Sequence, residues 1–244
     1  MTGPDGPADS AGTPWARREL GAGGFEGDTG AADPALLTAL AAAPDDTALM
    51  RAVEASRFVV PVVADPTGVD ATGDPAVEKS VDMAAVTLVA PDGRRALPVF
   101  SGTGSLAAWD PEARPVPVTP SRAAQAAVQE RCDVLVADVA GPATRVLRPS
   151  MLWALAQQRP WEPAHTDPVV ARGVAAALAD EPDVLAHDLA EGQPAGEGVL
   201  GLALTLRPGL TAEEVRAVAT RVGERIATDG ELRARIDGLA FRIG

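Results

Sequence analysis

The segment Val81–Pro111 constrains the fold of this chain more than any other; it reads VDMAAVTLVAPDGRRALPVFSGTGSLAAWDP. Its two apolar runs are separated by Pro91–Gly93. Proline presets one backbone dihedral of a turn and glycine accepts a positive φ, so the segment predicts a strand, a tight turn and a second strand. We expect the strands over Met83–Ala90 and Arg94–Phe100, followed by a short helix that carries Trp109. This segment should therefore lie at the centre of the fold.

Helical and strand patterns alternate along the rest of the chain. Asp33 and Thr119 each precede a proline at a helix start, and Thr211 forms a capping box with Glu214. We expect an α+β fold with a mixed or antiparallel sheet flanked by helices, plus a smaller C-terminal α-β-β-α-β domain. The expected helices cover residues 34–43, 46–53, 120–130, 149–155, 168–179 and 211–226, and the expected strands 58–63, 116–118, 134–139, 144–147, 184–189, 199–206 and 239–243.

Changes in composition divide the chain into three regions. Residues 1–33 are rich in Gly, Asp, Pro and Ala without apolar periodicity, which predicts an irregular N-terminal arm. Trp15 and Phe25 are exceptions: either they pin this arm to the body, or the arm is a mobile tail. Residues 34–160 predict one α+β domain and residues 168–244 a smaller one, joined by a proline-rich linker.

Charge and cysteine content argue against several functions. The chain has 21 Arg and Lys against 34 Asp and Glu, a net charge of −13, which repels phosphate backbones and argues against nucleic-acid binding. Charges or prolines interrupt every stretch of about 18 residues that could cross a membrane. Cys132 is the single cysteine, so no intrachain disulfide can form. We expect a cytoplasmic protein.

The strand-to-helix turn after Phe100 is the best-placed candidate binding site. Exposed amides at the start of a helix can hold an anion. The simpler interpretation is that a tight turn of this kind needs glycine and a capping hydroxyl. The turn has neither a P-loop lysine nor a nucleophile elbow. Its residues are Ser101, Gly102, Thr103, Gly104 and Ser105.

Two further residues are candidates for binding. Lys79 is the sole lysine in a chain that otherwise uses arginine, so either a specific ion pair or chance retains it. Trp109 could form an exposed apolar patch with Trp153 and Trp161, as a binding module would require.

Metal and catalytic signals are weak. Glu162, His165 and Asp167 carry suitable ligand atoms, but their spacing in a proline-rich linker matches no known motif. His187 is expected to fill a half-exposed sheet position, and Cys132 to be a buried, inert thiol. We therefore predict no catalytic residue, no metal and no cofactor.

Several segments together resemble the SseB family (enhanced serine sensitivity protein B) in its actinobacterial form. They are a helix pair before Phe58, then EKSVDMAAVTL, LPVFSGTGSLAAW, CDVLVADVAGP and VLRPSMLWAL. The resemblance covers roughly residues 13–165, and the remainder is similar to the C-terminal portion of the same group. These motifs are structural, so the resemblance implies a fold without implying a reaction.

The expected function is non-catalytic. We expect a cytoplasmic interaction or adaptor module, or a ligand-binding module, with a protein partner or a small ligand and possible homo-oligomerisation. The alternative is a small hydrolase or transferase acting at the Ser101–Ser105 turn, with Asp110 or Asp138 nearby. An enzyme needs a pocket with converging polar groups, whereas a binding module needs an open groove or patch.

Overall fold

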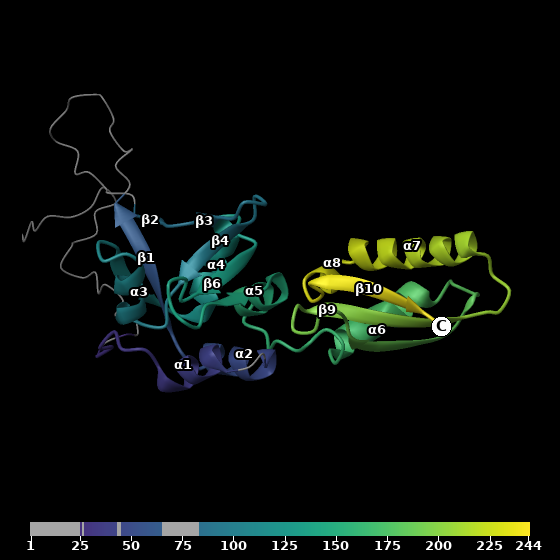
Figure 1. The fold of residues 1–244 in the computed structure, drawn as a ribbon, viewed down its shortest axis with the longest axis horizontal. Helices are drawn as coiled ribbons and strands as arrows, with labels where there is room; N and C mark the ends of the chain where they lie inside the picture. The colour runs from purple at the N-terminus through teal and green to yellow at the C-terminus, as the bar shows by residue number, and fades with distance from the viewer. Residues whose placement is uncertain (1–24, 26, 43–44, 65–82) are drawn as a thin grey trace, which may run out of the picture.

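The computed structural model describes residues 25, 27–42, 45–64 and 83–244 (Figure 1). Trp15, Lys79 and the polar loop that the sequence predicts over residues 65–80 lie outside these residues. Of the expected arm, the structure describes Phe25, which is half-buried, and residues 27–33.

Two sheets form the N-terminal unit, which we define as residues 34–156. The first has the strand order β2-β1-β5 and is antiparallel. The second has the order β3-β4-β6-β7, in which only the β4–β6 pair is parallel. The sheets meet where Val59 and Phe100 exchange backbone hydrogen bonds of 2.8 Å. The strands are β1 (Phe58–Ala64), β2 (Met83–Ala85), β3 (Leu88–Val89), β4 (Arg95–Val99), β5 (Arg114–Val118), β6 (Val134–Ala137) and β7 (Arg145–Leu147).

The strand expected over Met83–Ala90 is broken, and that prediction was wrong. Its first part is β2, which pairs with β1, and its second part is β3, which pairs with β4. The chain leaves one sheet at Val86 and enters the other at Leu88, so a continuous apolar run serves two sheets. The turn through Gly93, which has a φ of 86°, joins β3 to β4 as expected.

Helices cover one face of the second sheet and enclose the main core. Leu97, Leu135 and Leu147, from three neighbouring strands, point into it and are fully buried. Asp33 caps the first helix, where its carboxylate accepts the amide of Ala35 at 2.7 Å. The helices of this unit are α1 (Pro34–Ala41), α2 (Asp46–Glu54), α3 (Thr103–Trp109), α4 (Pro120–Gln129) and α5 (Pro149–Ala156).

The C-terminal unit, residues 168–243, has its own core and the expected α-β-β-α-β order. The short turn of helix that the sequence predicts over Leu232–Ile236 is present as α8 and begins slightly earlier. Leucines at alternate positions of the central strand β9 face helices α6 and α7. The sheet order is β10-β9-β8, with β10 parallel to β9 and β8 antiparallel to it. The elements are α6 (Pro168–Leu178), β8 (Val184–Glu191), β9 (Val199–Leu206), α7 (Ala212–Thr228), α8 (Gly230–Arg233) and β10 (Gly238–Ile243).

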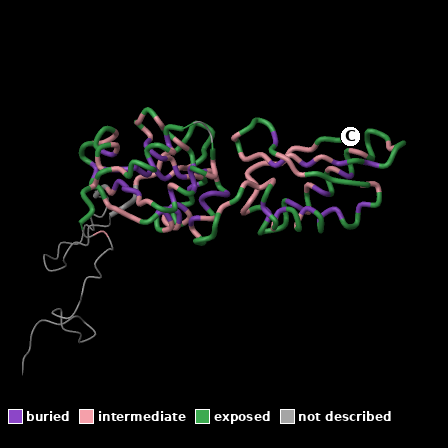
Figure 2. The backbone as a smooth tube through the Cα atoms, turned by 90° about the horizontal axis from the view of Figure 1, so that it is seen from below, coloured by how far each residue is buried: buried purple, intermediate pink, exposed green. Residues whose placement is uncertain are grey.

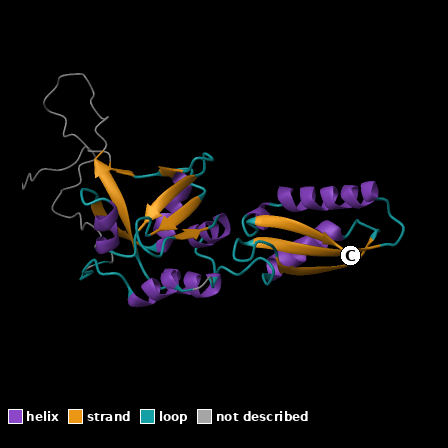
Figure 3. Cartoon of the chain, in the orientation of Figure 1, coloured by secondary structure: helices purple, strands orange, loops and turns teal. Residues whose placement is uncertain are grey.

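The two units lie end to end along the long axis (Figures 1 and 3). Their buried residues form separate groups, two in the N-terminal unit and one in the C-terminal unit (Figure 2). The α+β class expected from the sequence is confirmed. Independent folding of each unit remains a prediction.

Candidate functional site

The Ser101–Ser105 turn connects β4 to α3, and a carboxylate from the neighbouring strand holds its first residue. Ser101 is fully buried. Its amide donates to Asp138 Oδ1 at 2.8 Å and its hydroxyl to Asp138 Oδ2 at 2.7 Å. Ser105 Oγ lies 2.9 Å from the same hydroxyl. The polar groups of Ser101 are therefore satisfied within the protein.

Residues 28–32 of the arm cover this turn. The amide of Thr103 donates to the Gly30 carbonyl at 2.9 Å. A Cβ at Gly102 would lie 2.8 Å from both the Ala32 nitrogen and the Gly30 oxygen, so only glycine fits there without movement. Gly104, in contrast, faces open space. The glycine at position 102 thus serves packing against the arm.

Arg57 fastens the arm segment to the turn. Its guanidinium contacts both carboxylate oxygens of Asp28, at 2.5 and 3.0 Å, and donates to the carbonyls of Ala31 at 2.8 Å and Ser101 at 2.6 Å. The hydrogen bonds from Arg57, with help from the Gly30 amide, lower the pKa of Asp28 to about 2. Asp28 therefore stays ionised at neutral pH and keeps this contact.

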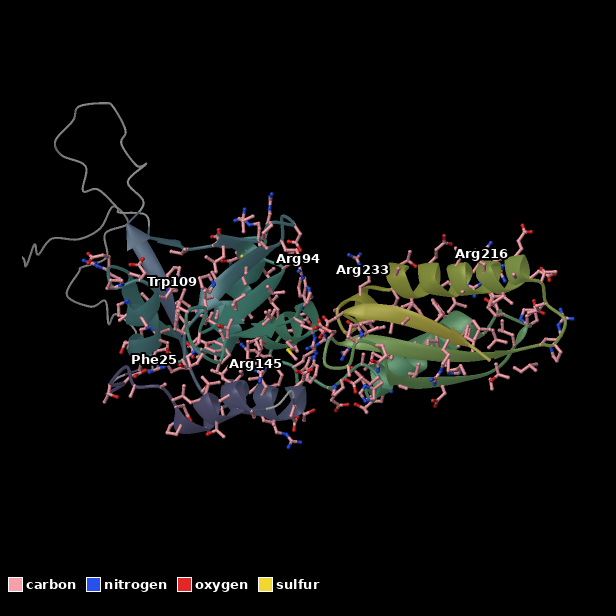
Figure 4. All side chains as sticks on the ribbon, viewed as in Figure 1. Phe25, Arg94, Trp109, Arg145, Arg216 and Arg233 are labelled. Carbon is pink, nitrogen blue, oxygen red and sulfur yellow. The ribbon has the colours of Figure 1, made fainter. Side chains whose placement is uncertain are left out.

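The tryptophans expected to form a patch have separate environments. Trp109, labelled in Figure 4, packs on Phe100 with a ring-centroid distance of 5.4 Å. Trp153 and Trp161 instead line a small cavity at the junction of the two units. The indole nitrogen of Trp161 donates to Ser150 Oγ at 3.0 Å. Trp109 is thus bound into the packing around α3.

The remaining sequence candidates have structural roles or no contact that indicates a ligand. Asp167 caps α6 and forms an ion pair of 2.8 Å with Arg235. His187 is exposed on β8, more than the half-exposed position expected. Cys132 is buried, and burial raises the pKa of its thiol despite the nearby charge of Arg95. Within the part of the chain that the structure describes, no group of three His, Cys, Asp or Glu residues could hold a metal ion.

A cleft with a volume of about 710 Å³ lies elsewhere, at the junction of the two units. It has three walls. The α1–α2 hairpin contributes Ala39, Asp45 and Leu49; the strand β7 and the turn before it contribute Thr144, Arg145 and Val146; the β8–β9 loop contributes Ala195, Gly196 and Glu197. Its volume is in the range of pockets that bind small ligands.

Arg148 joins the two units at the base of this cleft. Its guanidinium donates to Asp46 at 2.7 Å in its own unit, and to Asp237 at 3.0 Å and the Gly196 carbonyl at 3.0 Å in the other. Burial acts to lower the pKa of Arg148, but Asp46 and then Asp237 outweigh this effect and raise it. Asp237 also accepts the amide and the hydroxyl of Ser150. The junction is therefore an ionic network, with the Asp237 side chain only 8% exposed.

Arg145 lines the same cleft and faces backbone oxygens. Its Nε donates to the Leu40 carbonyl at 2.8 Å, and a terminal nitrogen donates to the Ala42 carbonyl. These carbonyls lie at the C-terminal end of α1, where a positive charge is favourable. Figure 4 labels Arg145 and Arg94, both on the N-terminal unit.

Comparison with known families identifies this part of the chain. Residues 34–154 match the family described as SseB protein N-terminal domain. Through these residues the chain belongs to the SseB family. No curated protein and no solved structure matches the chain. Among the helices that the structure describes, none is long and apolar enough to cross a membrane.

The SseB domain ends at the helix that Arg148 introduces, so the cleft combines this domain with residues that follow it. Arg148 and Pro149 lie within the VLRPSMLWAL motif, but the sequence indicates no partner for the arginine. The signal available was an arginine, not a Ser, Thr, Asp or Asn cap, immediately before the proline that starts α5. Its partners lie 102 and 89 positions away along the chain.

Proposed function

We propose that this SseB-family protein is a non-catalytic binding protein whose binding site is the cleft at the junction of its two units. The observation that carries the proposal is the cleft itself, formed by three walls from both units. A site at a junction is a common place for ligand binding, because two rigid bodies create concavity between them.

The chemistry of the cleft lining supports binding over catalysis. The lining has charged, small and aliphatic side chains, and no His or Cys is among the lining residues. Thr144, the one hydroxyl residue there, donates its Oγ1 proton toward the Asp138 carbonyl at 2.8 Å. A nucleophile next to a base, which acyl or phosphoryl transfer would use, is thus missing from this lining.

The alternative, a hydrolase or transferase acting at the Ser101–Ser105 turn, has less support. The Ser101 hydroxyl is buried and donates a hydrogen bond to the Asp138 carboxylate. A substrate would have to displace the segment that Arg57 fastens. We keep the cytoplasm as the proposed location, since a free buried thiol at Cys132 suits a reducing compartment.

A cleft-filling substitution tests the proposal. Val146 is 48% exposed within the cleft, and Val89 is 65% exposed on β3 outside the cleft lining. We expect Val146→Trp to abolish retention of partners or ligands that the wild-type protein retains from native lysate. Val89→Trp, the same change on another exposed strand position, should retain them. Quantitative mass spectrometry of the captured protein and small-molecule fractions is the measurement. Equal retention by both variants, or no retention by the wild type, would refute binding in the cleft.

A further inference from the structure

The strand β7 presents an unpaired edge to the cleft. It is the last strand of its sheet, paired only with β6 on its inner side. Two of its residues, Arg145 and Val146, line the cleft. An edge strand carries backbone donors and acceptors that an extended segment of another chain can pair with. The cleft thus contains a template for strand addition.

The other two walls define a slot along this edge. The α1–α2 hairpin and the Ala195–Glu197 loop both line the cleft together with this edge. Arg148 ties both of these walls together, since it bonds Asp46 of α2 and the Gly196 carbonyl of the loop. The slot is therefore held open before any partner binds, which reduces the entropy lost on binding.

Charge determines which partner fits. Two of the three arginines that line the cleft have most of their donors committed within the protein: Arg148 uses all three of its nitrogens and Arg145 two of its own. The third, Arg94, pairs its Nε with Asp92 at 2.7 Å and is exposed. Asp45 and Asp133 each accept a backbone amide through one oxygen, so their second oxygens stay available. Glu197 is exposed at the rim. The cleft therefore offers acceptors to a partner, and its carboxylates outnumber its arginines.

We propose that the partner is a basic extended peptide segment that adds as a strand to the β7 edge. This inference rests on the proposed function, and it names the partner class for that site. Lys or Arg side chains of the segment would meet Asp45, Asp133 and Glu197, and an apolar side chain would cover Val146. A second copy of this chain fits poorly, because its net charge is −13. Nucleic acid is excluded by the same sign of charge.

Three labelled seven-residue peptides test this on the full chain by fluorescence anisotropy. They alternate valine with lysine, serine or glutamate. We expect the lysine peptide to bind most tightly at about 50 mM salt and to weaken at about 500 mM, because salt screens exposed charges. A lysine peptide N-methylated at alternate residues should lose binding, since it cannot pair with a strand edge.

Variants locate the interaction. Glu197→Lys should lower the affinity for the lysine peptide by about fivefold, because the attraction between the Glu197 carboxylate and the lysines of the peptide becomes a repulsion at an exposed site. Glu224→Lys, the same change at an exposed position of α7 outside the cleft lining, should leave the affinity unchanged.

Each contrary outcome has a distinct meaning. Preferred binding of the serine or glutamate peptide, sensitive to Glu197→Lys, would overturn the basic partner while leaving the cleft as the binding site. Equal effects of both lysine variants, or full binding of the N-methylated peptide, would overturn strand addition at β7. Failure of all three peptides also refutes the inference, whereas the proposed function depends on the Val146→Trp comparison.

Discussion

At the scale of single residues, buried carboxylates determine what neighbouring polar groups can do. Asp138 directly follows β6 and has a positive φ of 50°, a conformation that Asp tolerates better than most residues. In this position its carboxylate accepts hydrogen bonds from the backbone amide and the hydroxyl of Ser101. The serine that looked most reactive in the sequence is thereby a structural residue, because its hydroxyl is used inside the protein.

Glu181 provides a pH-dependent test at the same scale. It is 4% exposed. Its two oxygens accept hydrogen bonds from Arg221, at 3.0 and 2.6 Å, and it forms an ion pair of 2.9 Å with Arg225. The hydrogen bonds from Arg221 lower its pKa below the ordinary value of 4.5. A lowered folded-state pKa adds stability that is fully present above pH 4.5 and is lost as pH falls through the folded-state value.

We expect Glu181→Gln to reduce the free energy of unfolding by about 1–3 kcal/mol at pH 7, because charged hydrogen bonds are lost. The difference from wild type should shrink as the pH is lowered toward 3. Urea denaturation at several pH values measures it. Glu224→Gln, an exposed change on the same helix as Arg221, should stay within about 0.5 kcal/mol of wild type. A difference that grows in acid would contradict the assignment.

At the scale of elements, the β4–α3 turn and the arm segment stabilise one another. Residues 28–32 add no strand or helix of their own. They are held through Arg57, through the amide of Thr103 and through the close approach at Gly102. An irregular segment is therefore ordered by contacts with the start of a helix.

Paired glycine substitutions test this packing. Gly102→Ala places a methyl group 2.8 Å from arm backbone atoms, and we expect it to lower the free energy of unfolding by about 1–3 kcal/mol. Gly104 lies in α3, and a Cβ added there meets no neighbouring atom within 4 Å. We therefore expect Gly104→Ala to raise the free energy of unfolding by up to about 1 kcal/mol, because alanine favours a helix over glycine. Urea denaturation of both variants measures the contrast. Equal losses would show that the arm does not pack on Gly102.

At the scale of the whole molecule, a buried ionic network joins the two units. Asp237 accepts hydrogen bonds from Arg148 and Ser150 across the junction. Trp161, in the segment 157–167 that connects the units, packs on the N-terminal core. Removing one partner of a buried pair leaves the other charge insufficiently compensated. The relative placement of the units, and with it the cleft, thus depends on few side chains.

We expect Asp237→Ala to lower the free energy of unfolding by about 2–4 kcal/mol and to make residues 157–167 more sensitive to limited proteolysis. Asp183→Ala removes an exposed pair with Arg207 inside the C-terminal unit and should cost less than about 1 kcal/mol. If Asp237→Ala left the cleavage rate of the connecting segment unchanged, the network would not be what holds the units together.

Most elements were predictable from the sequence because local chemistry defines them. Asp33, Thr119 and Thr211 cap the helices they were expected to begin. Gly93 forms the expected turn, and alternate leucines mark β9 as half-buried. The prediction of one continuous strand over Met83–Ala90 was wrong, because an apolar run does not reveal where the chain passes from one sheet to another. Pairing depends on distant β1 and β4, which local patterns do not specify.

By itself, the sequence determined the α+β class, the family and the positions of most helices and strands, since these follow from periodicity, capping and turn chemistry within a few residues. Only the tertiary structure decided that Ser101 is buried and that a cleft opens between the units. Asp46 and Asp237 reach Arg148 from opposite sides of the junction, after the chain has brought together residues about a hundred positions apart. Such contacts depend on how the two cores dock, and no local pattern encodes that geometry.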